Sequence, residues 1–205
     1  MAIVTVIVLL VLAGCGAKHH ISASPGVSEG AEIDVVVSFL QQQYSAQIAA
    51  GTPFVIKNSL SVAELHPDAS YSEFSSSLLS EASEEIPPDL IADFCAKNRT
   101  RHAVWPKLGQ RLHVRLLSRI ELNRLFAETP LEHPDGWEKF YAKYPSSPGI
   151  ITLSRVGFNQ SGDLALLYVG VQRGWVDGDG QIHVFRKLGG EWKEANTRLG
   201  SSWVS

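Results

Sequence analysis

Apolar side chains recur at steps of three and four residues over the first regularly patterned part of the chain. They are Ile33, Val36, Val37, Leu40, Tyr44 and Ile48. This spacing puts them on one face and predicts an amphipathic helix over Glu32–Ala50. Gly51-Thr52-Pro53 ends that helix, and the following run Phe54–Lys57 predicts a strand.

The middle of the chain is less regular. Residues 66–85 are polar and rich in serine, and we expect a mobile loop there with at most a short helical turn. Pro87-Pro88-Asp89 predicts the start of a second helix, because proline fits the first turn, where its missing N–H is not needed. The buried face of this helix is predicted to hold Leu90, Ile91, Phe94 and Cys95.

Two residue pairs have the spacing of a capping box, in which side chains and backbone amides at a helix start bond reciprocally. Ser118 with Glu121 and Asp135 with Glu138 therefore predict two more helices. The second of these helices carries an aromatic stripe of Trp137, Phe140, Tyr141 and Tyr144. Before the first box, residues 111–116 alternate strictly and predict a strand whose core-facing residues are Leu112, Val114 and Leu116.

The C-terminal part predicts an antiparallel meander. Its strands are expected at Ile150–Phe158, Leu164–Val171, Gln181–Lys187 and around Trp192. The second of these strands is apolar on both faces, which is typical of a central strand. Helices first and a meander last indicate an α+β fold, with an antiparallel sheet and helices packed on one face. In shape, such a fold is similar to cystatin or NTF2-like domains.

An apolar segment without charge, Ala2–Ala13, precedes the patterned part. It is shorter than the ~20 residues that span a bilayer, but it fits the apolar core of a secretory signal, which has ~7–15 residues. It leads into Leu12-Ala13-Gly14-Cys15. This run resembles the lipobox of bacterial lipoproteins. The resemblance implies that residues 1–14 are a signal peptide and that Cys15 is acylated and becomes the mature N-terminus.

The same resemblance implies a location. Acyl chains contribute ~0.8 kcal/mol per buried CH₂ and would hold the mature chain on a membrane. Gly16, in place of an aspartate, favours the periplasmic face of the outer membrane over the inner membrane. Residues 15–30 are rich in Ser, Gly and Ala and predict a flexible tether, which leaves 31–205 as a single α+β domain. The first residues lack the Lys or Arg that such signals usually carry, so an upstream start stays open.

The charge balance bears on the class of binding partner, and the cysteine content bears on disulfide formation. The chain has 205 residues, with 18 Lys and Arg against 21 Asp and Glu, and a net charge of −3. This balance argues against a nucleic-acid partner, which requires a basic face for the phosphates. With Cys15 acylated, Cys95 has no disulfide partner, and we interpret it as a small buried apolar residue.

Three patches resemble one family. They are Asp93-Phe94 with Lys97-Asn98, the segment from Trp137 to Pro145, and the run Ser154-Arg155-Val156-Gly157-Phe158-Asn159. Together they are similar to an uncharacterised family of bacterial secreted proteins and lipoproteins, over the C-terminal part of the chain. The resemblance implies relatives and no particular chemistry.

The usual catalytic and cofactor motifs are not found. The sequence has no nucleophile elbow, no dinucleotide or phosphate loop and no zinc-protease spacing, so we predict no cofactor, no metal and no catalytic residue. Asp177-Gly178-Asp179-Gly180 is similar to the start of a calcium loop. Leu188 stands where that loop needs its last carboxylate, so a tight turn between strands is favoured.

The best candidate site is a surface loop near the end of the meander. It holds Arg173, Trp175, Asp177 and Asp179. A tryptophan flanked by charges can anchor a partner, and the alternative is that it folds back onto the sheet edge. Arg155 and Asn159 form a second candidate. If Arg155 faces inward, it needs either a carboxylate of this chain or a bound anion.

Two functions remain from the sequence. The first is a membrane-anchored lipoprotein with a non-enzymatic binding or envelope-interaction domain of unknown ligand, and an envelope protein as partner. The second is a periplasmic hydrolase or small-molecule binder that uses a pocket between the sheet and the Trp137 helix. A pocket lined by at least two converging titratable groups would favour the second function.

Overall fold

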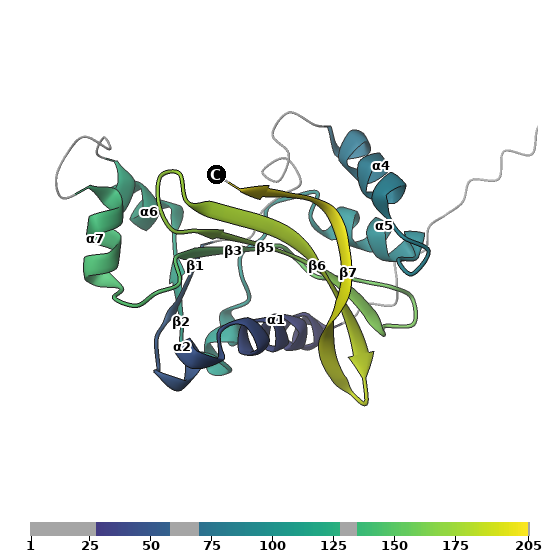
Figure 1. The fold of residues 1–205 in the computed structure, drawn as a ribbon, viewed down its shortest axis with the longest axis horizontal. Helices are drawn as coiled ribbons and strands as arrows, with labels where there is room; N and C mark the ends of the chain where they lie inside the picture. The colour runs from purple at the N-terminus through teal and green to yellow at the C-terminus, as the bar shows by residue number, and fades with distance from the viewer. Residues whose placement is uncertain (1–27, 58–69, 128–134, 205) are drawn as a thin grey trace, which may run out of the picture.

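The computed structural model describes residues 28–57, 70–127 and 135–204. The predicted signal peptide, Cys15 and most of the predicted tether lie outside these ranges. Within them the fold is α+β, as predicted, with helices around one sheet (Figure 1). The elements are α1 (Glu29–Gln43), α2 (Ser45–Ala49), β1 (Phe54–Lys57), α4 (Tyr71–Glu81), α5 (Pro88–Lys97), the 3-10 helix η1 (Pro106–Gln110), β2 (Val114–Leu117), α6 (Arg119–Phe126), α7 (Gly136–Lys143), β3 (Ile150–Leu153), β4 (Gly157–Phe158), β5 (Leu164–Gln172), β6 (Gly178–Leu188) and β7 (Glu191–Val204).

The sheet is mixed, so the prediction of a purely antiparallel sheet is wrong. The strand order is β2-β1-β3-β5-β6-β7, and β4 pairs with β5 beyond the end of β3. The strands β5, β6 and β7 form the predicted antiparallel meander, whereas β1 runs parallel to both β2 and β3. Parallel neighbours need long crossover connections, and the helical segments between β1, β2 and β3 provide them.

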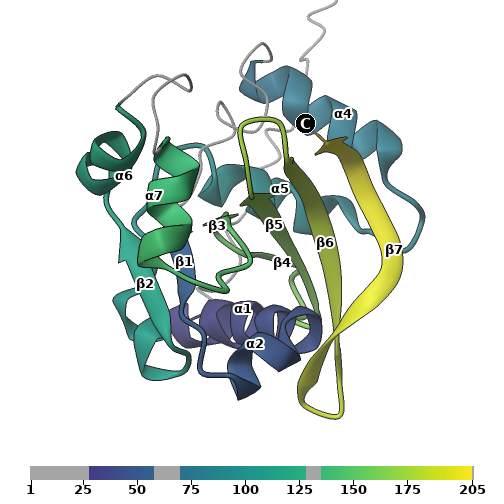
Figure 2. The ribbon, with the colours of Figure 1, turned by 60° about the vertical axis from the view of Figure 1, so that its left-hand side comes forward.

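Helices cover both faces of the sheet, so the prediction of helices on one face is also wrong. One face packs against α1, in a continuous apolar cluster with side chains of β1, β3 and β5. The other face packs against α4 and α5 near β5–β7 and against α6 and α7 near β1 and β2 (Figure 2). The reason lies in β5, whose two apolar faces both need cover from water.

Two predicted boundaries in the first half also change. The long helix is divided at Tyr44 into α1 and α2. The Ser-rich segment predicted as a mobile loop forms α4 over Tyr71–Glu81, while its first residues lie outside the described ranges. A capping box between Ser70 and Glu73 starts α4, and Phe74 and Leu78, four residues apart, bury its inner face.

Two strands of the C-terminal part also differ from the predictions. The first strand of the meander is interrupted between β3 and β4, where the Ser154 hydroxyl accepts the backbone amide of Tyr168 and replaces a ladder bond. The strand around Trp192 is long, because β7 continues along β6 to Val204 through two register shifts. Within the described ranges no helix is long and apolar enough to cross a bilayer.

Candidate functional site

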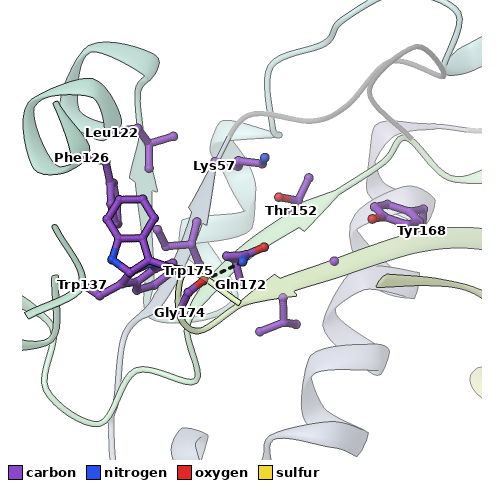
Figure 3. Close-up of a pocket in the computed structure, with 12 residues that line it drawn as sticks. Lys57, Leu122, Phe126, Trp137, Thr152, Tyr168, Gln172, Gly174 and Trp175 are labelled. Atoms are coloured by element: carbon purple, nitrogen blue, oxygen red, sulfur yellow. Dashed lines mark hydrogen bonds between the residues drawn. The ribbon is translucent and has the colours of Figure 1, made fainter. Parts of the chain in front are cut away.

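A cavity of about 410 Å³ lies between the sheet and the helices α6 and α7 (Figure 3). It opens on the face that carries two separate helix layers, between the apolar cluster under α5 and the cluster under α7. The floor is made by side chains of β1, β3 and β5, and the wall by side chains of α6, α7 and the turn after β5. Among the described residues, the two helix layers do not meet over this part of the sheet, and the cavity lies between them.

The floor follows from strand register. Val55 pairs with Ile150 and Ile56 with Ile151. Lys57 and Thr152 are the next residues along these two parallel strands, and both line the cavity. Thr152 in turn pairs with Gly170 on β5. A row from Lys57 through Thr152 to Gly170 therefore crosses three strands on the cavity side of the sheet.

Gly170 keeps this floor open. Tyr168 stands two residues earlier on the same face of β5, and its ring leans along the strand over the glycine. A Cβ atom at Gly170 would lie 2.9 Å from the Tyr168 hydroxyl oxygen, so any other residue there would require the Tyr168 side chain to shift. A glycine inside a strand often marks a place where another group approaches the backbone closely. Here the approaching groups are the Tyr168 hydroxyl and the cavity itself.

Aromatic rings form the wall at the other end. The Phe126 ring, at the end of α6, makes edge-on contacts with two tryptophan rings. The centroid of its ring lies 5.0 Å from that of Trp137 and 5.8 Å from that of Trp175. Capping boxes fix the starts of α6 and α7, as predicted, and so hold these rings in place. Gly136 allows the close passage, because a Cβ there would lie 2.4 Å from the Phe126 ring.

A tight turn between β5 and β6 positions Trp175. The backbone amides of Arg173 and Gly174 both donate to the Asp177 carbonyl oxygen, at 2.7 and 3.0 Å. The Trp175 indole Nε1 donates to the Asp135 carboxylate at 2.8 Å, and so ties the turn to the start of α7. Gln172, the last residue of β5, donates its side-chain amide to the Gly174 carbonyl at 2.7 Å.

Lys57 is the one charged residue of the cavity lining within the described ranges, and that lining contains no Asp, Glu, His or Cys. Burial lowers the pKa of the Lys57 ammonium group, and the nearby Arg101 cation lowers it further. No ion pair joins Lys57 to a carboxylate of the described residues. The cavity therefore has a cationic end without a matching negative charge from those residues.

The four residues of the predicted surface loop lie close together. Arg173 pairs with Asp179 at 2.6 Å and with Asp177 at 3.5 Å, and Asp179 stands inside β6 rather than in the loop. Trp175 remains 43% exposed, yet its ring packs on Phe126 and lines the cavity. The turn thus holds Trp175 at the edge of the cavity, while Arg173 bonds within its own hairpin.

Arg155 and Asn159, the second predicted pair, have partners within the chain. The Arg155 guanidinium bonds both carboxylate oxygens of Glu32 at 2.7 and 2.5 Å, and Glu32, in the first turn of α1, is 1% exposed. The Asn159 side-chain oxygen accepts the backbone amides of Asp163 and Leu164. Arg155 therefore joins α1 to the break between β3 and β4, and Asn159 closes the turn before β5.

Lys57, Thr152 and Tyr168 were missed as site residues from the sequence. Each belongs to a strand that reads as apolar core, and only the pairing of β1 with β3 brings Lys57 and Thr152 together. The charge of Lys57 is the one signal that could have indicated the site. Lys57 ends a strand whose other residues, Phe54–Ile56, are all buried, and a charge at that position needs an explanation.

Within residues 28–57, 70–127 and 135–204, no group of three His, Cys, Asp or Glu side chains is placed to hold a metal ion. The Cys95 thiol is buried, as predicted, and burial raises its pKa to about 11. No protein-family model, curated protein or solved structure matches this chain. The resemblances to bacterial lipoproteins and to an uncharacterised secreted family stay predictions.

Proposed function

We propose that this protein is a membrane-anchored lipoprotein whose folded part binds a small amphipathic molecule in the cavity between the sheet and α7. The observation that carries the proposal is the cavity itself, with aromatic rings at one end and a polar floor at the other (Figure 3). Its volume of about 410 Å³ falls within the ~300–1,000 Å³ range of ligand sites, and such sites combine apolar walls with a few polar groups.

The lining favours binding over hydrolysis. Two titratable side chains, Lys57 and Tyr168, face the cavity, and this supports a pocket function over a purely surface-based one. A hydrolase site also needs a nucleophile hydrogen-bonded to a base. The described lining offers no Ser, Cys, His or carboxylate, and its one aliphatic hydroxyl, Thr152, makes no hydrogen bond to Lys57. Non-enzymatic capture of a small molecule close to a membrane is the function that these side chains support best.

A neutral aromatic probe tests the pocket. We expect 2-naphthylmethanol to bind with a Kd on the order of tens of micromolar, from ~0.5 kcal/mol per non-hydrogen atom. Leu122 lies partly buried on the cavity wall, and Leu122→Trp should fill the space and weaken binding about tenfold or more, as measured by calorimetric titration. Leu79→Trp, at an exposed position of α4, is the matched control and should bind like the wild type. Equal binding by both variants would place the probe elsewhere.

The anchor is tested on the full-length chain in a bacterial host. We expect the protein in the membrane fraction, with a mature N-terminus at Cys15 and the added mass of acyl chains by mass spectrometry. Cys15→Ser should remove both the added mass and the membrane association. Cys95→Ser is the matched control, since that thiol is buried inside the fold and should leave acylation unchanged. A Cys15→Ser protein that stays in the membrane with unchanged mobility would contradict the anchor.

A further inference from the structure

We infer that the molecule bound in this cavity is a compact monocarboxylate, with its carboxylate at Lys57 and its apolar body against Trp137 and Trp175. This inference rests on the proposed function and names the class of ligand for the same site. It depends on how charge, hydrogen-bonding groups and aromatic rings are distributed around the cavity.

The cavity has two chemically different ends. Figure 3 shows the aromatic rings gathered on α6, α7 and the turn after β5, while Lys57, Thr152 and Tyr168 stand apart from them on the strands. A ligand that satisfies both ends must be amphipathic, with one polar head and one apolar body. A wholly apolar ligand would remove the polar floor from water without giving it partners, which costs free energy.

The sign of the head group follows from Lys57. Its ammonium group is held in a partly buried place near the Arg101 cation, and within the described residues no carboxylate neutralises it. Charge-assisted hydrogen bonds between an ammonium group and a carboxylate are about twice as strong as neutral ones. A negative head group would therefore gain most at this end, and a positive one would be repelled.

Thr152 adds a directional donor. Its side chain lies next to Lys57 in the row across β1 and β3, is buried, and has no hydrogen-bond partner among the described residues. A hydroxyl and an ammonium group side by side can donate to the two oxygens of one carboxylate. The site therefore fits a carboxylate better than a neutral alcohol, whose single oxygen brings no negative charge to the ammonium group.

Volume limits the apolar body. A cavity of about 410 Å³ lies at the lower end of the ~300–1,000 Å³ range of ligand sites, so the ligand must be a compact molecule. A bicyclic aryl carboxylate and a medium-chain alkyl carboxylate share the required chemistry, and both are compact. The rings of Phe126, Trp137 and Trp175 favour the aryl carboxylate through edge and stacking contacts.

Three probes with one ring system test the head group. 2-Naphthoate, 2-naphthylmethanol and 2-naphthylmethylamine are titrated against the wild-type protein at neutral pH, with octanoate and octanol as the alkyl arm. We expect 2-naphthoate to bind about tenfold or more tighter than the alcohol, as for a charged hydrogen bond, and the amine to bind weakest. Octanoate is expected to bind more weakly than 2-naphthoate but more tightly than octanol.

Variants of Lys57 test whether this residue binds the carboxylate of the ligand. Lys57→Met should remove the preference for 2-naphthoate while keeping the affinity for the alcohol, and Lys57→Arg should retain the preference. Lys107→Met, at an exposed position of η1, is the matched control and should behave like the wild type. Equal affinity of the acid and the alcohol for the wild-type protein would overturn the inference and leave the pocket intact. If none of the probes binds, the proposed function itself fails.

Discussion

The two faces of the sheet are packed in different ways although the same strands form both. On the face toward α1, one row across β1, β3 and β5 consists of Ile56, Ile151 and Val171, and all three are buried in a continuous cluster. One step along the strands, the opposite face presents the row from Lys57 through Thr152 to Gly170. The first row is close-packed, whereas the second forms the floor of a cavity.

The two faces therefore have different roles: one stabilises the fold, and the other lines the cavity. Alternation in a strand assigns successive residues to opposite faces, so one short segment serves both purposes. On the α1 face the row consists of branched aliphatic side chains, which are all buried in one apolar cluster. On the other face a cation, a hydroxyl and a glycine stand where packing alone would favour apolar residues, and they line the cavity between the apolar clusters under α5 and α7.

The largest expected effect comes from a substitution on the buried face toward α1. Leu167, on β5, is fully buried in the cluster against α1, and Leu167→Ala should lower the free energy of unfolding by about 2–5 kcal/mol through lost contacts and a new cavity. The same change at Leu122, on the wall of the existing cavity, should cost about 1 kcal/mol or less, because alanine favours the helix and the space is already open. Urea unfolding of both variants checks the comparison, and equal costs would contradict it.

A smaller effect is expected at the edge of the cavity. Trp175→Ala loses an edge contact with Phe126 and a hydrogen bond to Asp135, both partly exposed, so unfolding should become easier by only about 1 kcal/mol. Binding of 2-naphthylmethanol should weaken about fivefold or more, because one wall of the cavity is removed. Val176→Ala, at the neighbouring 82% exposed position, should change neither quantity. Loss of several kcal/mol in Trp175→Ala would make Trp175 a core residue.

Local signals in the sequence predicted a large part of the fold. The boxes at Ser118 and Asp135 correctly place α6 and α7, because a helix start is fixed by hydrogen bonds between residues three apart. Pro88 marks the start of α5 for a different reason, because proline lacks an N–H and fits the first turn of a helix. The pattern of β5, apolar on both faces, indicates a central strand that needs cover on both sides. This conflicts with the prediction of helices on one face only.

The rest depends on contacts between distant parts of the chain. Nothing within residues 54–57 specifies that β1 runs parallel to β2 and β3, and the position of Lys57 beside Thr152 follows from that pairing. Arg155 illustrates the same limit. The sequence predicted that Arg155, if it faced inward, would need a carboxylate of the chain or a bound anion. Only the packing of α1 on the sheet identifies this partner as Glu32.

The smallest effect concerns the cation on the cavity floor and has a definite dependence on pH. Burial and the Arg101 charge lower the pKa of Lys57 in the folded protein, below the ~10.4 expected in the unfolded chain. Between these two values the folded state binds fewer protons than the unfolded state, so the stability of the wild type rises with pH over that range. The cost of burying the charge is fully present below the folded pKa.

Lys57→Met removes that cost without opening a cavity. We expect the variant to be more stable than the wild type at neutral pH, by roughly 1 kcal/mol or less, and the difference to shrink as the pH rises toward ~10.4. Urea unfolding of both proteins at neutral and alkaline pH measures this difference, and subtraction cancels the titration of the other lysines. Lys107→Met, on the exposed surface of η1, should show no such trend. If Lys57→Met were less stable than the wild type at neutral pH, Lys57 would contribute to the packing of this face, and the contrast between a face built for stability and a face kept open for a ligand would not hold.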